Sequence, residues 1–237
     1  LAQDALTIEN EQRYRMTYWA KADNSRDITI QIFKNEAPWN FNYGLWSIDS
    51  LSTVWQRFEH SFKGTATGSD GKLAIQTGDV TGKVWVDDVL IEPLNCQADE
   101  DSLISDGSFN SGVGCWDIEI QSWDSAEIET DYSVFHSTPS STRIDNNEEQ
   151  LIYQVQLSQN GLQITAGNRY EISYWAMASE ERTIATELSK EVEPYQPNYG
   201  LWHIDSISTT WQSFEYQFTA SASVSDAKLG FQAGTST

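Results

Sequence analysis

The chain contains a long internal repeat, and this repeat constrains its fold more than any other feature of the sequence. Residues 1–81 align with residues 157–237 without a gap when the chain is shifted by 156 positions. The strongest matches are RYRMTYWAKA with RYEISYWAMA, and NYGLWSIDSLSTVWQRFEHSF with NYGLWHIDSISTTWQSFEYQF. Residues 82–156 occur once. The repeat therefore predicts two copies of one module within the 237 residues.

The repeated segments alternate between apolar and polar residues, as half-buried β-strands do. In the segment 13–22, one face carries Tyr14, Met16, Tyr18 and Ala20. The second copy keeps this alternation in Tyr170, Ile172, Tyr174 and Ala176. We expect these faces in the core, and the Gly, Asn, Asp and Ser residues between the short segments indicate turns. The predicted fold class is all-β, with tandem β-sandwich modules of the jelly-roll type.

The net charge of the chain limits the kinds of molecule that it can bind. The chain carries 35 Asp and Glu against 14 Lys and Arg, which gives a formal net charge of −21. Such a chain repels phosphate backbones and anionic membrane surfaces, so neither nucleic acid nor a membrane is an expected partner. No apolar run approaches the roughly 20 residues that span a bilayer, and no signal peptide is visible. Neutral ligands and cations are compatible with this charge.

The two cysteines, Cys96 and Cys115, have 18 residues between them. They lack the spacing of a metal-binding Cys-x-x-Cys motif, and no histidine is adjacent to either one. We expect a disulfide across the loop that joins the two modules, which would place the protein outside the cytosol. The alternative is two free, buried thiols.

Four short motifs are spread over nearly the whole chain. They are NEAPWNFNYG (35–44), GKVWVDDVLIEPL (82–94), LISDGSFNSGVGCW (103–116) and QITAGNRYEISYWAMA (163–178). In turn they resemble the Ala-Pro-aromatic loop, the closing strand, the opening signature and the central strand of a known superfamily. It is the superfamily of carbohydrate-binding modules that includes families 4, 9, 16 and 22, with a galactose-binding-like jelly roll. The resemblance implies a carbohydrate-binding, non-catalytic protein.

The resemblance also sets the predicted domain boundaries, with a first module at 1–95, a linker at 96–102 and a second module at 103–237. Measured against the family pattern, the first module lacks its opening strands and the second lacks its closing strand. One explanation is a segment of a longer tandem array or a multidomain enzyme. The other is strand exchange between neighbouring chains, because an incomplete sandwich exposes sheet edges. Exchange would produce head-to-tail self-association.

Sugar binding requires flat aromatic side chains for the apolar faces of pyranose rings and planar amides or carboxylates for the hydroxyls. Trp39 and Tyr195 follow a proline in the two copies, where the resemblance implies an aromatic that stacks on sugar. Gln76 and Gln232 lie on the non-core face of a strand in which family 4 has a sugar-contacting glutamine. Asn35 is a further implied contact. The alternatives are aromatics folded against the sandwich edge and glutamines that face only solvent.

Further aromatic residues are candidates. Trp19 and Trp175 alternate with core residues, so we expect them on the outward face, either lining the cleft or under a covering loop. Trp123 flanks the opening loop and is another ligand candidate. Trp55 and Trp211 match a family core position and are expected to pack inside. The aromatic residues of the repeated NYGLW motif either extend the binding platform or hold the long loop in place.

The resemblance also implies a structural calcium ion, with Asp88 and Asp87 as ligands and Asn110 where the family has a glutamate. Adjacent aspartates on a strand point to opposite faces, so Asp87 and Asp88 do not form a facing acid pair. None of the 3 histidines has a metal-ligand spacing, and no nucleophile-elbow motif occurs. The sequence therefore predicts no catalytic residues.

Two functions follow from these observations. In the first, the modules bind a polysaccharide, with a neutral β-glucan as the preferred ligand, and tandem copies add avidity. In the second, the chain is a structural repeat of an extracellular filament, surface layer or adhesin. Trp39 and Tyr195 discriminate between the two functions. Exposure in a groove favours sugar binding, whereas burial against a neighbouring module favours assembly.

Overall fold

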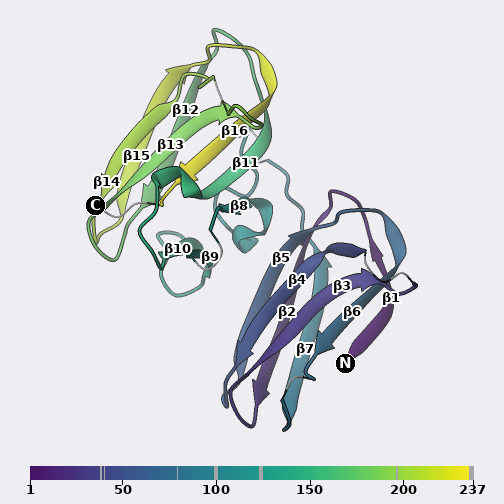
Figure 1. Cartoon of the computed structure of the whole chain (residues 1–237). Coiled ribbons are helices and arrows are strands. Elements are labelled where there is room, and N and C mark those ends of the chain that lie inside the picture. The colour runs from purple at the N-terminus through teal and green to yellow at the C-terminus, as the bar shows by residue number, and fades with distance from the viewer. Residues whose placement is uncertain are drawn as a thin grey trace. The chain divides into compact units, whose positions relative to one another are not determined.

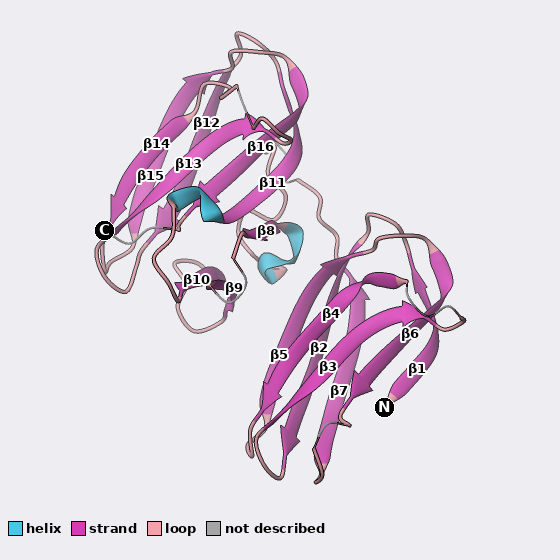
Figure 2. Ribbon diagram, viewed as in Figure 1, coloured by secondary structure: helices cyan, strands magenta, loops and turns pink. Residues whose placement is uncertain are grey.

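The computed structural model describes residues 1–37, 39, 41–78, 80–98, 101–122, 125–195 and 197–234. These residues form mostly β-strands, drawn in magenta in Figure 2, and two short 3-10 helices, η1 (Gly112–Cys115) and η2 (Ile152–Gln154). No helix in the described ranges is long and apolar enough to cross a membrane. The all-β prediction is confirmed. The chain divides into two compact units, Leu1–Cys96 and Gln97–Thr237.

The first unit is a sandwich of two antiparallel sheets, with strand orders β1-β6-β3-β4 and β5-β2-β7 (Figure 1). Its strands are β1 (Ala2–Ile8), β2 (Arg13–Ala22), β3 (Arg26–Lys34), β4 (Asn42–Leu51), β5 (Gln56–Lys63), β6 (Gly68–Gln76) and β7 (Val84–Pro93). The period of two in each strand turns one set of side chains inward, where Met16, Tyr18 and Ile30 are 0 % exposed. The core therefore lies between the two sheets.

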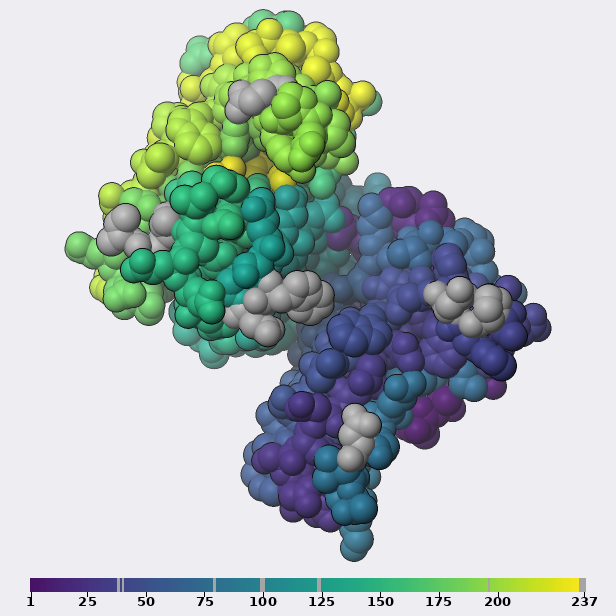
Figure 3. Space-filling model, viewed as in Figure 1, coloured from purple at the N-terminus to yellow at the C-terminus, as the bar shows by residue number. Residues whose placement is uncertain are grey.

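The second unit contains a five-stranded sheet with the order β14-β13-β16-β11-β8 and the two-stranded sheets β12-β15 and β10-β9. Its strands are β8 (Asp117–Ile120), β9 (Ala126–Asp131), β10 (Ser141–Asn146), β11 (Val155–Ile164), β12 (Arg169–Ala176), β13 (Arg182–Lys190), β14 (Trp202–Ile207), β15 (Gln212–Thr219) and β16 (Val224–Gln232). The core packs the inner face of the five-stranded sheet against β12 and β15. Figure 3 shows one face of the molecular surface, coloured from the N-terminus to the C-terminus.

The repeat in the sequence reappears as equivalent strands. After the shift of 156 positions, β3, β5 and β6 have the same bounds as β13, β15 and β16. The glycine of the repeated NYGLW motif has a positive φ in both units, 116° at Gly44 and 112° at Gly200. A Cβ at Gly200 would lie 2.5 Å from the carbonyl oxygen of Thr219. Both the backbone conformation and the close approach therefore require glycine in this turn.

The strands outside the repeat differ between the units. Among the described residues, β7 of the first unit pairs with β2, and the second unit adds β8, β9 and β10. The inward side chains of β2 are buried as expected. Their counterparts on β12 are only half-buried, which differs from the prediction of a buried core face for Tyr170, Ile172, Tyr174 and Ala176. The physical reason is that no strand covers this side of β12 in the described part of the second unit.

Candidate functional site

The outward face of the five-stranded sheet gathers amide and carboxylate side chains from neighbouring strands. The strand register places Gln156 of β11 opposite Gln232 of β16 on one side and Glu119 of β8 on the other. The Nε2 of Gln232 donates a hydrogen bond to Oε2 of Glu187 on β13 at 2.9 Å. These residues alternate with core residues such as Leu229, so they point away from the core. A polar row thus crosses four strands.

Two acceptors on this face are buried and have no protein partner. Gln232 is 5 % exposed, and its Oε1 makes no hydrogen bond to any described residue. The Oδ1 of Asn160 is also buried and accepts no hydrogen bond from a described residue. The Nδ2 of the same side chain donates to Asp117 at 3.0 Å. A buried polar atom left without a partner costs about 1–3 kcal/mol. The face therefore offers acceptors to a ligand that carries hydroxyl groups.

The cation on this face is already paired. Lys228 is 4 % exposed, and its Nζ lies 2.5 Å from Oε1 of Glu119. The hydroxyl of Ser158 donates to the same carboxylate oxygen at 3.1 Å. Because Lys228 is neutralised in this way and Glu187 adds a further carboxylate, the face has no net attraction for anions.

Exposed apolar side chains border the polar row. Trp202 of β14 lies opposite Glu187 in the register and is 47 % exposed. Ile204, two residues further along the same face, is 56 % exposed. Tyr195, in the loop between β13 and β14, is 50 % exposed. Aromatic surface beside planar amides is the combination of groups that pyranose rings require.

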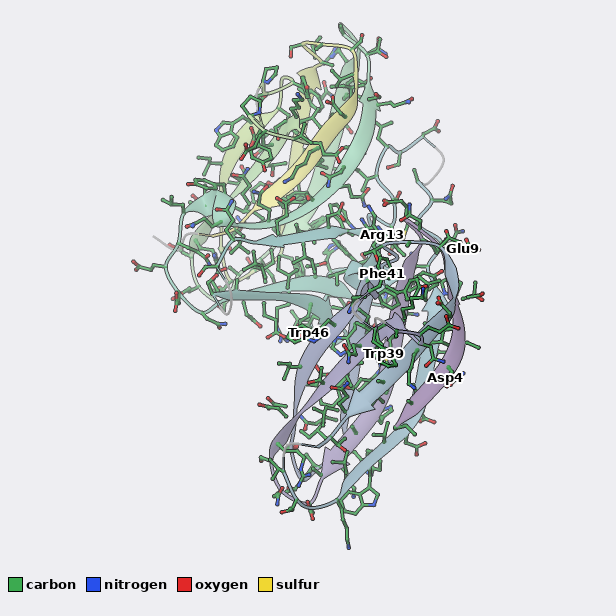
Figure 4. The ribbon with its side chains drawn as sticks, turned by 45° about the vertical axis from the view of Figure 1, so that its right-hand side comes forward. Asp4, Glu9, Arg13, Trp39, Phe41 and Trp46 are labelled. Carbon is green, nitrogen blue, oxygen red and sulfur yellow. The ribbon has the colours of Figure 1, made fainter. Side chains whose placement is uncertain are left out.

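The first unit repeats part of this arrangement. Gln76 at the end of β6 is exposed and lies opposite Thr29 of β3. Gln31 lies opposite Trp46 of β4, which is 52 % exposed. Figure 4 shows the side chains of Trp46 and Trp39. Trp39 belongs to the loop between β3 and β4. No strand equivalent to β8 is present in the described part of this unit, so its amide row is shorter.

Trp39 and Tyr195 share an unusual backbone conformation. Their φ angles are 47° and 57°, and each backbone N–H donates to the carbonyl three residues earlier, Glu36 at 3.1 Å and Val192 at 2.9 Å. Residues other than glycine rarely adopt positive φ, and such residues cluster at ligand sites. Both side chains are at least half exposed. Asn35 contacts Trp39 through its backbone oxygen, which accepts from the indole Nε1 at 3.3 Å.

The repeated NYGLW motif divides into two roles. Tyr43 and Tyr199 are 5 % and 3 % exposed and belong to the cores of their units. Trp46 and Trp202 instead project from the outward face. The sequence left both roles open for all four aromatics. The tyrosines hold the loop in place, and the tryptophans extend the apolar border of the face.

Trp19 and Trp175 lie on a different surface from the amide row. They belong to β2 and β12, so they project from the outer side of the other sheet of each unit. Trp175 stacks on His136 with ring centroids 3.8 Å apart. Trp55, which was expected to pack inside, is 42 % exposed, with the Lys21 ammonium 5.2 Å from its ring centroid. Trp123 lies outside the described residues.

Comparison with protein families identifies the chain. The family described as "Carbohydrate binding domain" matches residues 101–237, which is more than half of the sequence. The chain belongs to this family of carbohydrate-binding modules. The family is non-catalytic, so the predictions of carbohydrate binding and of a chain that is not an enzyme are both confirmed.

Solved structures of carbohydrate-binding modules are similar to this one. A family 4 module is 21 % identical over 39 % of this chain and 72 % of its own, with a TM-score of 0.36. The N-terminal CBM22-1–CBM22-2 tandem domain of a Paenibacillus barcinonensis protein is 11 % identical over 100 % of this chain and 76 % of its own, with a TM-score of 0.41. The N-terminal cellulose-binding domain of Cellulomonas fimi β-1,4-glucanase C is 20 % identical over 40 % and 68 % of the two chains, with a TM-score of 0.35. A search of curated proteins finds no significant match.

The calcium ligands predicted for this carbohydrate-binding protein come from both units. Asp87 and Asp88 belong to β7 of the first unit, where Oδ1 of Asp87 accepts the backbone N–H of Asp88 at 2.9 Å. Asn110 belongs to the second unit, and its Nδ2 donates to Ser108 at 2.7 Å. The described residues contain no group of three or more His, Cys, Asp or Glu placed to hold a metal ion. Calcium binding stays a prediction.

The disulfide prediction is confirmed. Cys96 and Cys115 are both disulfide-bonded, and the chain contains no other cysteine. The bond closes the segment between the last strand of the first unit and the end of η1. This segment includes most of the LISDGSFNSGVGCW motif (103–116). Within that motif, Asp106 organises the turn, because its two carboxylate oxygens accept the backbone N–H groups of Asn110 and Ser111, each at 2.8 Å.

Sequence reasoning missed two buried carboxylates. Asp205 is 9 % exposed and accepts hydrogen bonds from the hydroxyls of Tyr174, at 2.5 Å, and Tyr216. Its counterpart Asp49 accepts from Tyr18 and contacts Nε2 of His60 at 2.8 Å. The sequence did carry a signal for them. In each copy of the repeated NYGLW segment, the alternation of inward and outward residues places the aspartate on the inward face. They link the two sheets of each unit and are structural.

Proposed function

We propose that the outward face of the five-stranded sheet is the carbohydrate-binding face of the second unit, and that Gln76, Trp46 and Trp39 form a related site in the first. The observation that carries this proposal is Gln232, whose carboxamide oxygen is buried, faces away from the core and lacks a protein partner. A sugar hydroxyl would satisfy this oxygen. Trp202 and Tyr195 supply aromatic surface for the apolar side of the ring.

The ligand that fits this face is a neutral polysaccharide. Lys228 is paired with Glu119, and the net charge of the chain is −21. An anionic polymer would therefore meet repulsion, because the described cation of this face, Lys228, is already neutralised. Among neutral polymers we choose a β-glucan, because the resemblance to families 4, 9, 16 and 22 implies that class. The two sites would bind one polymer with avidity.

Isothermal titration of the full chain with soluble β-glucan, α-glucan and polygalacturonate tests the proposal. We expect binding to the β-glucan and none to polygalacturonate. The double variant Gln76→Ala with Gln232→Ala should weaken binding at least tenfold, about 1.4 kcal/mol. The double variant Trp46→Ala with Trp202→Ala should weaken it by a similar factor, because the aromatic border is lost.

Trp175→Ala provides the matched control for these variants. It removes an exposed tryptophan of the same unit from the other sheet, so glycan affinity should stay within twofold of the wild-type value. Circular dichroism verifies that every variant is folded. A folded amide double variant with wild-type affinity would contradict the proposed site, and preference for polygalacturonate would contradict the neutral ligand.

We infer in addition that the protein functions outside the cytosol. The disulfide between Cys96 and Cys115 supports this inference, because such bonds persist in oxidising compartments. A binding module in that setting raises the local concentration of polysaccharide for an enzyme linked to it.

A further inference from the structure

The two glutamines on the outward face of the five-stranded sheet have their nitrogen ends held by the protein. The Nε2 of Gln232 donates to Glu187 at 2.9 Å, and the Nε2 of Gln156 donates to the backbone oxygen of Tyr153 at 2.7 Å. A carboxylate and a carbonyl group only accept hydrogen bonds, so each amide directs its nitrogen towards them. The oxygen ends of both amides are therefore the ends that a ligand can use.

Three further donors on the same face are also engaged. The Nδ2 of Asn160 donates to Asp117 at 3.0 Å, and its buried Oδ1 accepts nothing from a described residue. The Ser158 hydroxyl and the Lys228 ammonium group both donate to Oε1 of Glu119. The groups that remain for a ligand are therefore chiefly acceptor oxygens.

The strand register gathers these oxygens around Gly230. This residue lies opposite Glu187 on one side and Ser158 on the other. A Cβ at this position would lie 3.3 Å from Oε1 of Gln156, so the amide oxygen extends over the glycine. Because Gly230 has no side chain, no group of β16 stands between the side chains of β11 and β13 at this point. Trp202 continues the same row beyond Glu187 and supplies aromatic surface.

The charges on the face favour a cation. Glu187, Glu119 and Asp117 contribute three carboxylates, and Lys228 contributes one ammonium group that already contacts Glu119. The Glu119 side chain is 39 % exposed, so a ligand can reach it. A ligand ammonium group would donate charge-assisted hydrogen bonds to these oxygens and would be attracted by the negative field of the chain.

The first unit lacks the central carboxylate of this row. The counterpart of Glu187 is Gln31, and the counterpart of Gly230 is Ala74. An amide both donates and accepts hydrogen bonds, as a neutral sugar hydroxyl does, whereas a carboxylate only accepts. The residues of the first unit therefore suit a neutral glycan, and those of the second suit a glycan that donates.

We propose that the second unit binds a β-linked glycan with free amino groups more tightly than the neutral glucan of the same linkage. The location of the binding face is taken from the proposed function, on which this inference rests. Glu187 determines the preference. Its carboxylate has about four lone-pair sites, so it can accept from a ligand ammonium group as well as from Gln232 and from Asn198, whose Nδ2 lies at 3.4 Å. Trp202 stacks on the pyranose ring and thereby selects an amino sugar over other ammonium ligands.

Isothermal titration with two hexasaccharides tests the proposal. One is cellohexaose, and the other is the β-1,4-linked glucosamine hexamer, in which an ammonium group replaces one hydroxyl of each ring. The full chain carries Trp46→Ala, which removes exposed aromatic surface from the first site, so the titration reports the second. In mildly acidic buffer, where the amines are protonated and ordinary carboxylates are ionised, we expect the glucosamine hexamer to bind at least tenfold more tightly. Glu187→Gln installs the residue of the first unit and should reduce this ratio to less than threefold.

Glu215→Gln is the matched control for charge. Glu215 is exposed on β15, in the other sheet of the same unit, so its substitution removes the same charge away from the face. The affinity for the glucosamine hexamer should then stay within twofold of its value without this substitution. A lysine hexapeptide offers as many side-chain ammonium groups without pyranose rings, and it should bind at least tenfold more weakly than the glucosamine hexamer.

Three results would each overturn the proposal. They are equal affinities for the two hexasaccharides, equal losses in Glu187→Gln and Glu215→Gln, and a lysine peptide that binds as tightly as the glucosamine hexamer. With any of them, the binding face itself still stands if Gln232→Ala weakens the binding of cellohexaose. Cellohexaose affinity that is unchanged in folded Gln232→Ala would instead contradict the face, and this inference with it. Circular dichroism verifies the folding of each variant.

Discussion

At the residue scale, the buried Asp205 makes the free energy of unfolding depend on the ionisation of two tyrosines, Tyr174 and Tyr216. The hydrogen bond to Asp205, together with burial, raises the pKa of Tyr216 to about 12. Burial and the same carboxylate raise the pKa of Tyr174 well above its ordinary value. The unfolded chain releases these protons near pH 10, whereas the native protein keeps them. We therefore expect the free energy of unfolding to be greatest below pH 10 and to fall as the pH rises towards 12.

Urea denaturation at pH 9, 10 and 11 measures this dependence. Tyr216→Phe removes one of the raised groups, so the loss of stability between pH 9 and 11 should be smaller than in the wild type. Tyr153→Phe is the control, because Tyr153 is 45 % exposed and its substitution should leave the slope as it is. A wild-type free energy of unfolding that is constant up to pH 11 would contradict the predicted linkage.

At the element scale, the segment that leads into β14 contains two aromatics with opposite exposures. Tyr199 is 3 % exposed in the core, and Trp202 is 47 % exposed on the outward face. Tyr199→Ala removes a buried ring and should lower the free energy of unfolding by about 3–5 kcal/mol. Trp202→Ala should change it by less than about 1 kcal/mol. Thermal or urea unfolding of both variants checks this, and equal losses would show that Trp202 also has a packing role.

At the scale of the whole molecule, the disulfide constrains the unfolded chain. It closes a loop with 18 residues between Cys96 and Cys115. On the chain-entropy account, a loop of this size contributes on the order of 3 kcal/mol. Reduction should lower the denaturation midpoint accordingly, and Cys96→Ser with Cys115→Ser should have the same effect without reductant. An unchanged midpoint in the double variant would mean that strain in the native bond offsets the entropic gain.

Much of the fold could be predicted from individual residues. Alternation placed Tyr14, Met16 and Tyr18 in the core because side chains of a strand point to opposite faces in turn. The same rule put Gln76 and Gln232 on the outward face. It gave no information about which sheet a strand joins, so it did not separate the surface of Trp19 from that of Gln76. Strand pairing between distant segments decides this, and period alone does not encode it.

The sequence by itself determined the all-β class, the equivalence of the two copies and the family, because these depend on periodicity and on motifs that each segment carries alone. Only the tertiary structure decided that the amide of Gln232 donates to Glu187 and that Gln156 lies opposite Gln232, since the three residues come from different strands. It also decided that Trp55 is exposed. Burial depends on which neighbours cover a strand, and the YWA segment shared by β2 and β12 is more buried in β2, which pairs with both β5 and β7.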